Sequence, residues 1–360
     1  MSDAVFTTAA RIADEELFPA AQEIDRADIV PRSRFDVLAE AGLFGIAGPA
    51  EHRFLDLDPR SARRVIATIG GGCGSTFFCW VQHHGVVRTL RASHHAELRD
   101  TLLPELCSGS SIAGVAFAHL RRVDRRAITA TRVEGGWRFD GHAPWASSWG
   151  IADVFAIAAE GDAGEVVWGL IPGVESATVR PTALSLPVFA ATGTVALDFD
   201  GCVVPDDRII AVEQLDTWRV ADRRRASIGQ PAVLGVTERA IRLLRSAQRN
   251  EDDAAGTTAD SLSDDLTSRW ERDDEVVAAL SDPSSDHDVL AAASEHRAAC
   301  LGLAHRSTTA LLAAVGGGGM DLSHPAQRLA REAMFYVIQA QTTDGRDAVL
   351  RAAMHADRGT

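Results

Sequence analysis

The chain has 360 residues, more than one hydrophobic core usually organises, so we expect two or three domains. Hydrophobic residues make up 46% of it and charged residues 24%, proportions typical of an ordinary soluble globular protein. The formal net charge is −14 and basic clusters are only scattered, which argues against a nucleic acid partner.

The cysteines and the apolar runs indicate a cellular compartment. The five cysteines are odd in number and irregularly spaced, which argues against a disulfide framework. No signal peptide and no run of about 18 apolar residues is visible, so we expect a cytoplasmic protein with no membrane partner. Cys79, His83 and His84 place a thiol and an imidazole one helical turn apart. No further ligand pair follows at metal spacing, so we expect no metal site.

The first 110 residues show helical periodicity. Apolar residues recur at helical spacing over residues 4–30, and Pro31 is placed to begin a helix that ends at Gly42. Further helices are predicted at residues 59–69, in a segment ending near Arg91, and at 95–107. We therefore predict an N-terminal helical domain over residues 1–110.

The pattern changes to strands over residues 111–213. Between Gly135 and Pro205, apolar residues alternate or run in short blocks, and the breaks are Gly, Pro, Asp and Ser. Such a pattern is typical of a compact antiparallel β domain. Helices, then strands, then helices predict an α+β chain with the β domain between two helical parts.

Helical periodicity returns after the strands and predicts a C-terminal helical domain over residues 214–360. The helical pattern runs from Trp218 to Arg249. Residues 250–288 are rich in Asp, Glu, Ser and Thr, so we expect a solvated loop there with one short helix around 262–280. Helices resume at Val289, break at a run of glycines, and end with a helix from Pro325 to about Gln341.

Four stretches of the chain follow one another in a recognisable order and spacing. They are Phe35–Ile46, Pro144–Val154, Thr192–Pro205 and Gly316–Arg331. Together they resemble the acyl-CoA dehydrogenase superfamily over nearly the whole chain. The resemblance implies three domains, helical then β then helical, with FAD lying between the β domain and the C-terminal helices.

An isoalloxazine ring needs an aromatic wall and a hydrogen-bond donor near its N5 edge. Trp145 and Ser147 are two residues apart, hence on one face of a strand, and can supply both. By the resemblance, Ala116 and Phe117 would line the other side of the ring. Without the resemblance, Trp145 also fits a core aromatic residue and Ser147 a turn residue.

The glycine run suggests a second cofactor contact. Gly316 and Gly317 would let a backbone approach the cofactor without side-chain obstruction, and their amides can face phosphate oxygens. The resemblance implies that this turn reaches the FAD of a neighbouring subunit, hence a homodimer or homotetramer. Thr342 is a further expected cofactor contact. A plain helix–helix turn would also explain the glycines.

Two departures from the family pattern leave the cofactor contacts incomplete. Ala313 replaces the usual Gln before the glycine turn. The long helix ends at Gln248–Glu251, where the family usually has an aromatic residue and Gly after its arginines. The partner of the pyrophosphate is therefore open, and Arg249 is a candidate for it.

The catalytic base departs most from the family. Desaturation of an acyl thioester removes a proton alpha to the carbonyl, usually by a buried Glu of raised pKa, as a hydride leaves the beta carbon for flavin N5. The resemblance implies two helical positions for this Glu, which Ala340 and Arg225 occupy. The nearby acids are Asp222, Glu238, Glu332 and Asp344, and the family uses the Arg331–Glu332 pairing structurally. His119, at the start of the substrate loop, is a candidate substrate contact.

Three functions remain open. The first is an FAD-dependent acyl-CoA dehydrogenase that desaturates an acyl-CoA or acyl-carrier thioester in fatty acid metabolism and passes electrons to an acceptor. The second is a flavin monooxygenase on the same fold, served by a flavin reductase and needing no Glu. The third is a non-catalytic partner subunit of a heteromer with an active relative. Fold likeness cannot separate them, because function depends on the site.

Overall fold

A computed structural model describes residues 2–52, 55, 57–122, 124–248, 254–282 and 287–355. The chain divides into two compact units. The β unit comprises Arg26–Leu57 and Ser75–Ala221, and the helical unit comprises Ser2–Asp25, Asp58–Gly74 and Asp222–Thr360. Neither unit is one continuous segment. The predicted three-domain division follows the order of helices and strands along the chain and stays a prediction.

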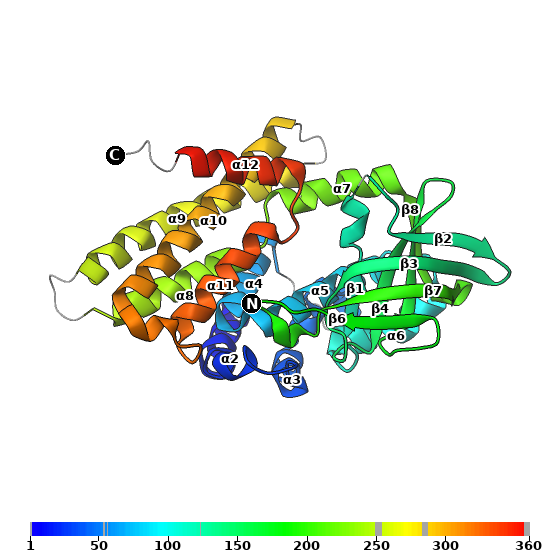
Figure 1. Ribbon diagram of the computed structural model, residues 1–360, viewed down its shortest axis with the longest axis horizontal. Coiled ribbons are helices and arrows are strands. Elements are labelled where there is room, and N and C mark those ends of the chain that lie inside the picture. Colours follow the sequence, from blue (N-terminus) through cyan, green and yellow to red (C-terminus); the bar gives the residue numbers. More distant parts are fainter. Residues whose placement is uncertain are drawn as a thin grey trace. The chain divides into compact units, whose positions relative to one another are not determined.

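One sheet of eight strands organises the described part of the β unit (Figure 1). The strands are β1 Ala113–Ala116, β2 Ile128–Val133, β3 Gly136–Ala146, β4 Val154–Gly161, β5 Glu165–Pro172, β6 Val179–Ala183, β7 Val195–Pro205 and β8 Ile209–Gln214. Their order is β6-β7-β3-β2-β4-β5-β8, and β1 pairs with β4. Most pairs are antiparallel, as predicted, but β1 and β2 each pair with β4 in parallel.

Helices of the β unit cover part of this sheet. They are α3 Arg32–Glu40, α5 Gly74–Arg91, α6 Ala96–Ser108 and the first half of α7 Leu215–Ser227. Leu90 from α5, Leu106 from α6, Ala158 from β4 and Trp168 from β5 belong to one buried cluster. Strand β4 is buried along almost its whole length. A strand covered on both faces reads as a continuous apolar run, which is how residues 154–159 appear in the sequence.

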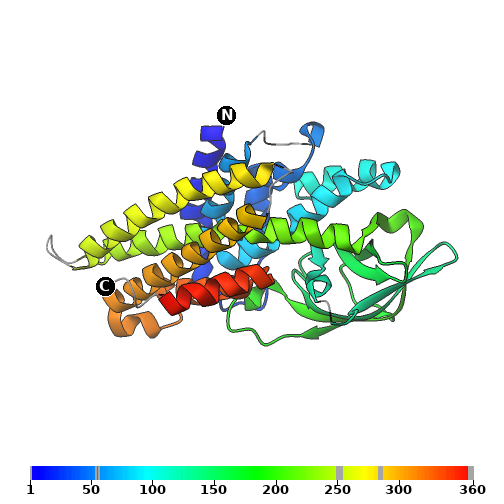
Figure 2. The ribbon, with the colours of Figure 1, turned by 90° about the horizontal axis from the view of Figure 1, so that it is seen from above.

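The helical unit is built from long helices that lie side by side. They are α1 Ser2–Arg11, α2 Phe18–Ile24, α4 Pro59–Gly72, α8 Ala232–Ser246, α9 Ala254–Ser281, α10 His287–Val315, α11 Pro325–Ile338 and α12 Thr343–His355. Figure 2 shows α8, α9 and α10 running together. Helices α4 and α8 approach closely at Gly71 and Gly235, because a Cβ on Gly235 would lie 1.8 Å from the carbonyl oxygen of Ala67.

Helix α9 corrects the prediction of a solvated loop with one short helix. It runs for 28 residues from Ala254 to Ser281. From Ala255 on, its buried residues recur every three or four positions, at Ala259, Leu262, Leu266, Trp270, Asp273 and Val276, and Gly256 is buried beside the first of them. This narrow apolar stripe packs against α8 and α10, while the other faces carry the acidic and hydroxyl residues that suggested a loop.

Helix α10 and the turn after it have the length and apolar composition of a membrane-spanning segment. The stretch His287–Met320 is long and apolar enough to cross a membrane, with a mean hydropathy of 1.2 in its best window, and 44% of that window is buried. A core helix passes the same test of length and composition, so this is weak support for a membrane span. The expected absence of a membrane partner stays a prediction.

Candidate functional site

In the β unit, the end of β3 carries two of the predicted flavin contacts. The Trp145 side chain is 48% exposed, whereas Ser147 is 5% exposed. The register of β3 against β7 shifts between Ala143 and Ala146, and Ser147 forms an isolated bridge with Val115. The regular alternation from which a shared face was predicted is therefore interrupted here. The Trp145 side chain is open to a ligand, whereas the buried Ser147 could contact a ligand only by hydrogen bonding through its hydroxyl.

A short chain of hydroxyl groups fixes Ser147. Thr194 donates to the Ser147 oxygen at 2.8 Å, which leaves the Ser147 hydrogen for another acceptor. Thr192 lies 2.8 Å from Thr194 and donates to the Phe189 carbonyl at 2.7 Å. The loop that presents these threonines passes close to Trp149, because a Cβ on Gly193 would lie 2.2 Å from the Trp149 carbonyl oxygen.

Ser148 is a residue of interest that the sequence did not point to. It is fully buried, its φ is 77°, and its hydroxyl has no hydrogen-bond partner among the described residues. A left-handed backbone at a residue other than Gly persists only where the surroundings impose it, and such strain is concentrated at functional sites. The only local signal is the pair of serines directly after a strand.

Ala116 and Phe117 lie at the end of β1. Ala116 follows Val115, the bridge partner of Ser147, and is 1% exposed, so its side chain faces the interior. The Phe117 ring packs against Trp168 and Trp218, with ring centroids 5.9 and 6.0 Å apart. The fold thus brings Ala116 near Ser147 and turns Phe117 toward an aromatic cluster. Their contact with a flavin ring stays a prediction.

His119 is 1% exposed, and its Nε2 lies 2.8 Å from the Ala158 carbonyl oxygen on β4. Burial lowers the pKa of His119 to about 4, so the imidazole is neutral near pH 7. Its Nδ1 has no partner among the described residues. His119 therefore anchors the loop to the sheet, and its contact with substrate stays a prediction.

The Cys79–His83–His84 group is spread through the core of the β unit. His83 accepts the N–H of Ala113 at 3.0 Å on Nδ1, and its Nε2 lies 3.1 Å from the Leu106 carbonyl oxygen. The Cys79 thiol faces the Thr192 carbonyl. No cluster of three or more His, Cys, Asp or Glu in the described chain could hold a metal ion.

In the helical unit, the loop after α11 holds the position predicted for a catalytic base. Helix α11 ends at Ile338, so the predicted helix to about Gln341 is too long. Ala340 has a φ of 49° and lies in a left-handed turn, not on a helix. The Thr342 hydroxyl accepts the N–H of Gly345 at 3.2 Å and caps α12. Its predicted contact with the cofactor would use the hydroxyl hydrogen.

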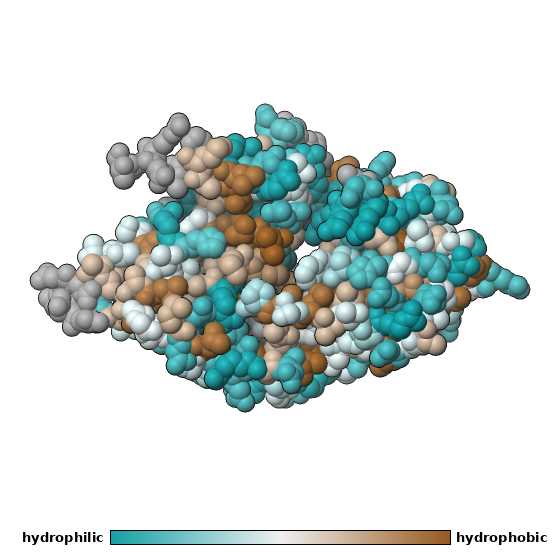
Figure 3. All heavy atoms as spheres, viewed as in Figure 1, coloured by the Kyte–Doolittle hydropathy of each residue, from teal (hydrophilic) through white to brown (hydrophobic). Residues whose placement is uncertain are grey.

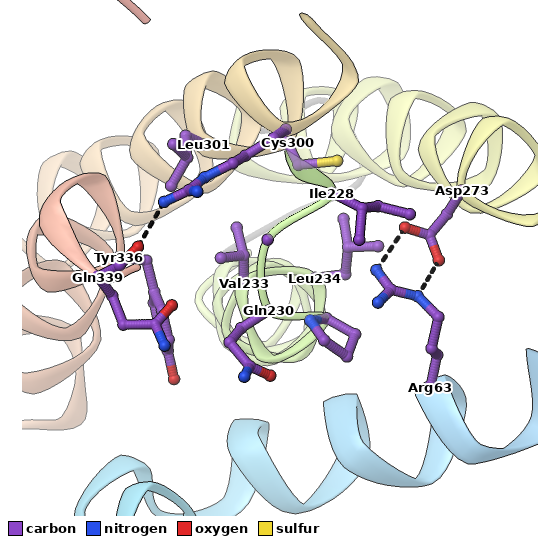
Figure 4. A pocket seen from close by; sticks show the side chains of 13 residues that line it. Arg63, Ile228, Gln230, Val233, Leu234, Asp273, Cys300, Leu301, Tyr336 and Gln339 are labelled. Atoms are coloured by element: carbon purple, nitrogen blue, oxygen red, sulfur yellow. Dashed lines mark hydrogen bonds and ion pairs between the residues drawn. The ribbon is translucent and has the colours of Figure 1, made fainter. Parts of the chain in front are cut away.

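A small cavity lies next to this loop, and Gln339 forms part of its wall (Figure 4). The Arg63–Asp273 pair lies at one side of it and Tyr336 at another. The cavity volume is about 10 Å³, which is the space of about one water molecule. An acyl thioester or a flavin cannot enter it.

Asp273 and Cys300 of the cavity wall form, together with His296 behind them, a Cys–His–Asp group that resembles a catalytic arrangement. Arg63 holds Asp273 through two hydrogen bonds of 2.6 and 2.7 Å. Asp273 Oδ1 lies 3.3 Å from His296 Nε2, and Cys300 Sγ lies 3.4 Å from the same nitrogen. One ring nitrogen cannot both donate to the carboxylate and take a proton from the thiol. Burial raises the pKa of Cys300 to about 12, so the thiol is not an activated nucleophile.

The acids near the predicted base positions have structural partners or lie at the surface. Glu332 pairs with Arg328 at 2.7 Å inside the unit, and Arg331 pairs with Asp25, so the expected Arg331–Glu332 pairing is wrong. Burial raises the pKa of Glu332 despite Arg328. Asp344 pairs with Arg223. Asp222 is buried, whereas Arg225 and Glu238 are exposed.

Gly316 and Gly317 begin the turn after α10. Gly316 has a φ of 68°, a conformation that favours glycine. A Cβ on either residue would meet nothing within 4 Å. The described part of the chain therefore leaves room for a larger residue than glycine at position 317. Their contact with a cofactor stays a prediction. Ala313 is exposed near the end of α10, and Arg249 lies outside the described residues.

Comparison with known proteins begins with a family model described as "Acyl-CoA dehydrogenase, N-terminal domain", which matches residues 2–110. The benzylmalonyl-CoA dehydrogenase of Aromatoleum aromaticum is 29% identical over 223 residues, 59% of this chain and 58% of that protein. The matched stretch therefore spans about half the length of the curated relatives.

Solved structures resemble the whole chain. The acyl-CoA dehydrogenase from Geobacillus kaustophilus has a TM-score of 0.80 and 15% identity, covering 98% of this chain and 97% of that one. The dibenzothiophene monooxygenase from Paenibacillus sp. A11-2 has a TM-score of 0.78 and 15% identity, covering 99% and 98%. Likeness at this low identity establishes the fold alone. It confirms the predicted order of a helical part, a β sheet and a second helical part.

Proposed function

The chain belongs to the acyl-CoA dehydrogenase superfamily, and from that premise we propose that it is an FAD-dependent oxidoreductase of the acyl-CoA dehydrogenase type. Its substrate in this proposal is an acyl thioester, an acyl-CoA or an acyl-carrier, and the reaction is α,β-desaturation. The observation that carries the proposal is the end of β3, where the half-exposed Trp145 is followed two residues later by the buried Ser147, whose hydroxyl keeps its hydrogen.

The residues of each unit fit a flavin. In the β unit, Trp145 provides apolar ring surface, and Ser147 retains a hydrogen to donate. The buried Ser148 hydroxyl, which has no partner among the described residues, is a second polar group at this strand end. In the helical unit, Gly316 and Gly317 expose backbone that a Cβ would not crowd. FAD, when bound, would supply the two-electron oxidant that accepts a hydride from substrate.

Such a reaction requires residues that bind and orient the cofactor and a base that removes the alpha proton, and this chain offers candidates for binding and orientation only. Ser147 would orient a bound ring by donating to it, and Trp145 would exclude water from one face. The deprotonating group is missing from its expected place, because Ala340 cannot accept a proton. Among the buried acids of the helical unit, Asp273 and Glu332 are held in ion pairs, and Asp222 also interacts with a neighbouring group. The proposal therefore assigns cofactor contacts to this chain and no base.

Anaerobic titration of the purified protein tests the proposal. A flavin spectrum that bleaches on addition of an acyl-CoA thioester is the expected result. Bleaching only with an added flavin reductase and reduced nicotinamide, with oxygen then consumed, would favour the monooxygenase. A colourless protein that binds no added FAD would exclude both and favour the non-catalytic partner subunit.

The monooxygenase is the second candidate because of a specific observation. Neither Ala340 nor Arg225 is a carboxylate, and monooxygenation needs no proton abstraction alpha to a thioester. The other expectations continue as parts of the proposal: an electron acceptor or reductase as partner, assembly as a homodimer or homotetramer, and a cytoplasmic location.

A further inference from the structure

Arg297 joins three segments of the helical unit. It lies on α10 and is 5% exposed. Its guanidinium donates to the carbonyl oxygens of Ala226 at 2.9 Å and Ala340 at 3.0 Å, and also to that of Gln339. A single buried side chain therefore ties α10 to the end of α7 and to the loop that follows α11.

The acceptors of Arg297 belong to helix ends. Helix α7 ends at Ser227 and α11 at Ile338, so the carbonyls of Ala226 and Gln339 lie where helical hydrogen bonding stops. The negative end of each helix dipole also favours a cation at this place. Without the guanidinium, the buried Ala226 carbonyl would keep only the N–H of Gly229, and the half-buried carbonyls of Gln339 and Ala340 would lose this donor.

The contacts of Arg297 flank the strained residue of the loop. Ala340 has a φ of 49°. The Arg297 guanidinium donates to the carbonyl oxygen of Ala340 and to that of the preceding residue, Gln339. A left-handed residue other than Gly is stable only where its neighbours over-determine the backbone. Gly229 makes room for the arginine, because a Cβ there would lie 3.1 Å from Arg297 Cγ and Cδ. Gly229 also has a φ of 72°.

We propose that Arg297 is a positioning residue, which sets the backbone of the Gln339–Thr342 loop and so the placement of Ala340 and Thr342. The conformational part of this inference stands on the hydrogen bonds within the helical unit. Its consequence, that Arg297 supports cofactor binding through the loop, rests on the proposed function.

Hydrogen–deuterium exchange tests the conformational part without any cofactor. Arg297→Met removes the donors and keeps an unbranched side chain. The reporters are the amides of Gly345 and Arg346, which bond to Thr342. We expect their exchange to become at least about tenfold faster, with α8 unchanged. Arg306→Met is the matched control, because this α10 arginine is 59% exposed and pairs with Asp265. Unchanged exchange in Arg297→Met would overturn the proposal.

A second variant keeps the test decisive if Arg297→Met does not fold. Arg297→Lys retains the charge, but a single ammonium cannot reproduce the planar fork that spans these carbonyls. We expect intermediate exchange in the loop, and exchange equal to wild type would again overturn the proposal.

Flavin retention tests the link to function. We expect Arg297→Met to raise the dissociation constant for FAD about tenfold. Arg297→Lys should raise it less, and Arg306→Met should leave it at the wild-type value. Faster loop exchange with unaltered FAD retention would overturn the link between loop and cofactor. A wild-type chain that binds no FAD would refute the proposed function, while the exchange measurement would still decide the role of Arg297.

Discussion

At the scale of single residues, the end of β3 carries the cofactor assignment. Trp145→Ala removes an exposed ring and Ser147→Ala removes one hydrogen bond of about 1 kcal/mol, or about fivefold in affinity. We expect both variants to retain less FAD after gel filtration, with the larger loss for Trp145→Ala. Trp137→Ala, near the start of the same strand, is the control. Unchanged flavin content in both variants would mean that the site lies elsewhere.

Ala340 provides a second test at this scale. Ala340→Glu places a carboxylate at the predicted base position, on a backbone that already holds a left-handed residue. If the chain binds acyl-CoA as proposed, we expect alpha-proton exchange in D₂O to rise about 10²–10⁴-fold. The gain should appear mainly toward neutral to alkaline pH, because bound flavin and thioester would bury the new carboxyl and raise its pKa. Ala340→Gln, of the same size but unable to act as a base, should show no gain. Rapid exchange in the wild type would contradict the missing base.

At the scale of elements, two histidines tie helical segments to strands of the β unit. His83 on α5 bonds to the backbone of Ala113 and Leu106, and His119 bonds to Ala158. Burial lowers the pKa of His83 to about 3 and that of His119 to about 4. The unfolded chain takes up these protons near pH 6.5 and the folded chain does not, so protonation favours unfolding. Their contribution is complete above pH 6.5 and is lost as the pH falls toward 4.

We therefore expect the free energy of unfolding to fall by about 1.4 kcal/mol per pH unit for each of these histidines below pH 6.5. Urea denaturation followed by circular dichroism at pH 7.5, 6 and 5 would measure it. His94→Gln, at an exposed histidine, should leave the slope unchanged. A denaturation midpoint that is constant from pH 7.5 to 5 would contradict the burial of neutral histidines.

At the scale of the whole molecule, the C-terminal elements of the helical unit carry a group of exposed large apolar side chains. They lie in the turn after α10 and on α11 and α12: Met320, Leu322, Met334, Ile338, Leu350 and Met354. Figure 3 shows hydrophobic residues over α12 and the adjoining end of α11. Large exposed apolar patches commonly mark interfaces between proteins. This surface is consistent with the homodimer or homotetramer predicted from the sequence.

We expect light scattering after size exclusion to give a mass of at least two chains. Leu350→Lys combined with Met354→Lys should shift the protein toward one chain, because both side chains are more than half exposed on α12. Val212→Lys, at an exposed valine of β8 in the β unit, is the control. A wild-type protein that is a single chain at micromolar concentration would contradict the expectation.

The sequence predicted most elements but not their partners. Alternation and apolar blocks located the strands between Ala113 and Gln214, and helical periodicity located most helices. The polar composition of residues 254–281 concealed an apolar stripe one residue wide per turn, so α9 was predicted as a loop with a short helix. The end of α11 was misplaced because no Gly or Pro marks it. The helix ends at Ile338, two residues before Ala340, whose left-handed backbone is held by contacts with another helix.

By itself the sequence predicted most helices and strands and, through four ordered stretches, the resemblance to the acyl-CoA dehydrogenase superfamily. Only the tertiary structure decided which charged and polar groups meet. Arg331 pairs with Asp25, 306 positions away, and not with the adjacent Glu332. Arg297 reaches carbonyls 71, 43 and 42 positions away. Local periodicity records which face a segment buries, but a buried charge or a free carbonyl is satisfied by whichever segment the fold brings beside it.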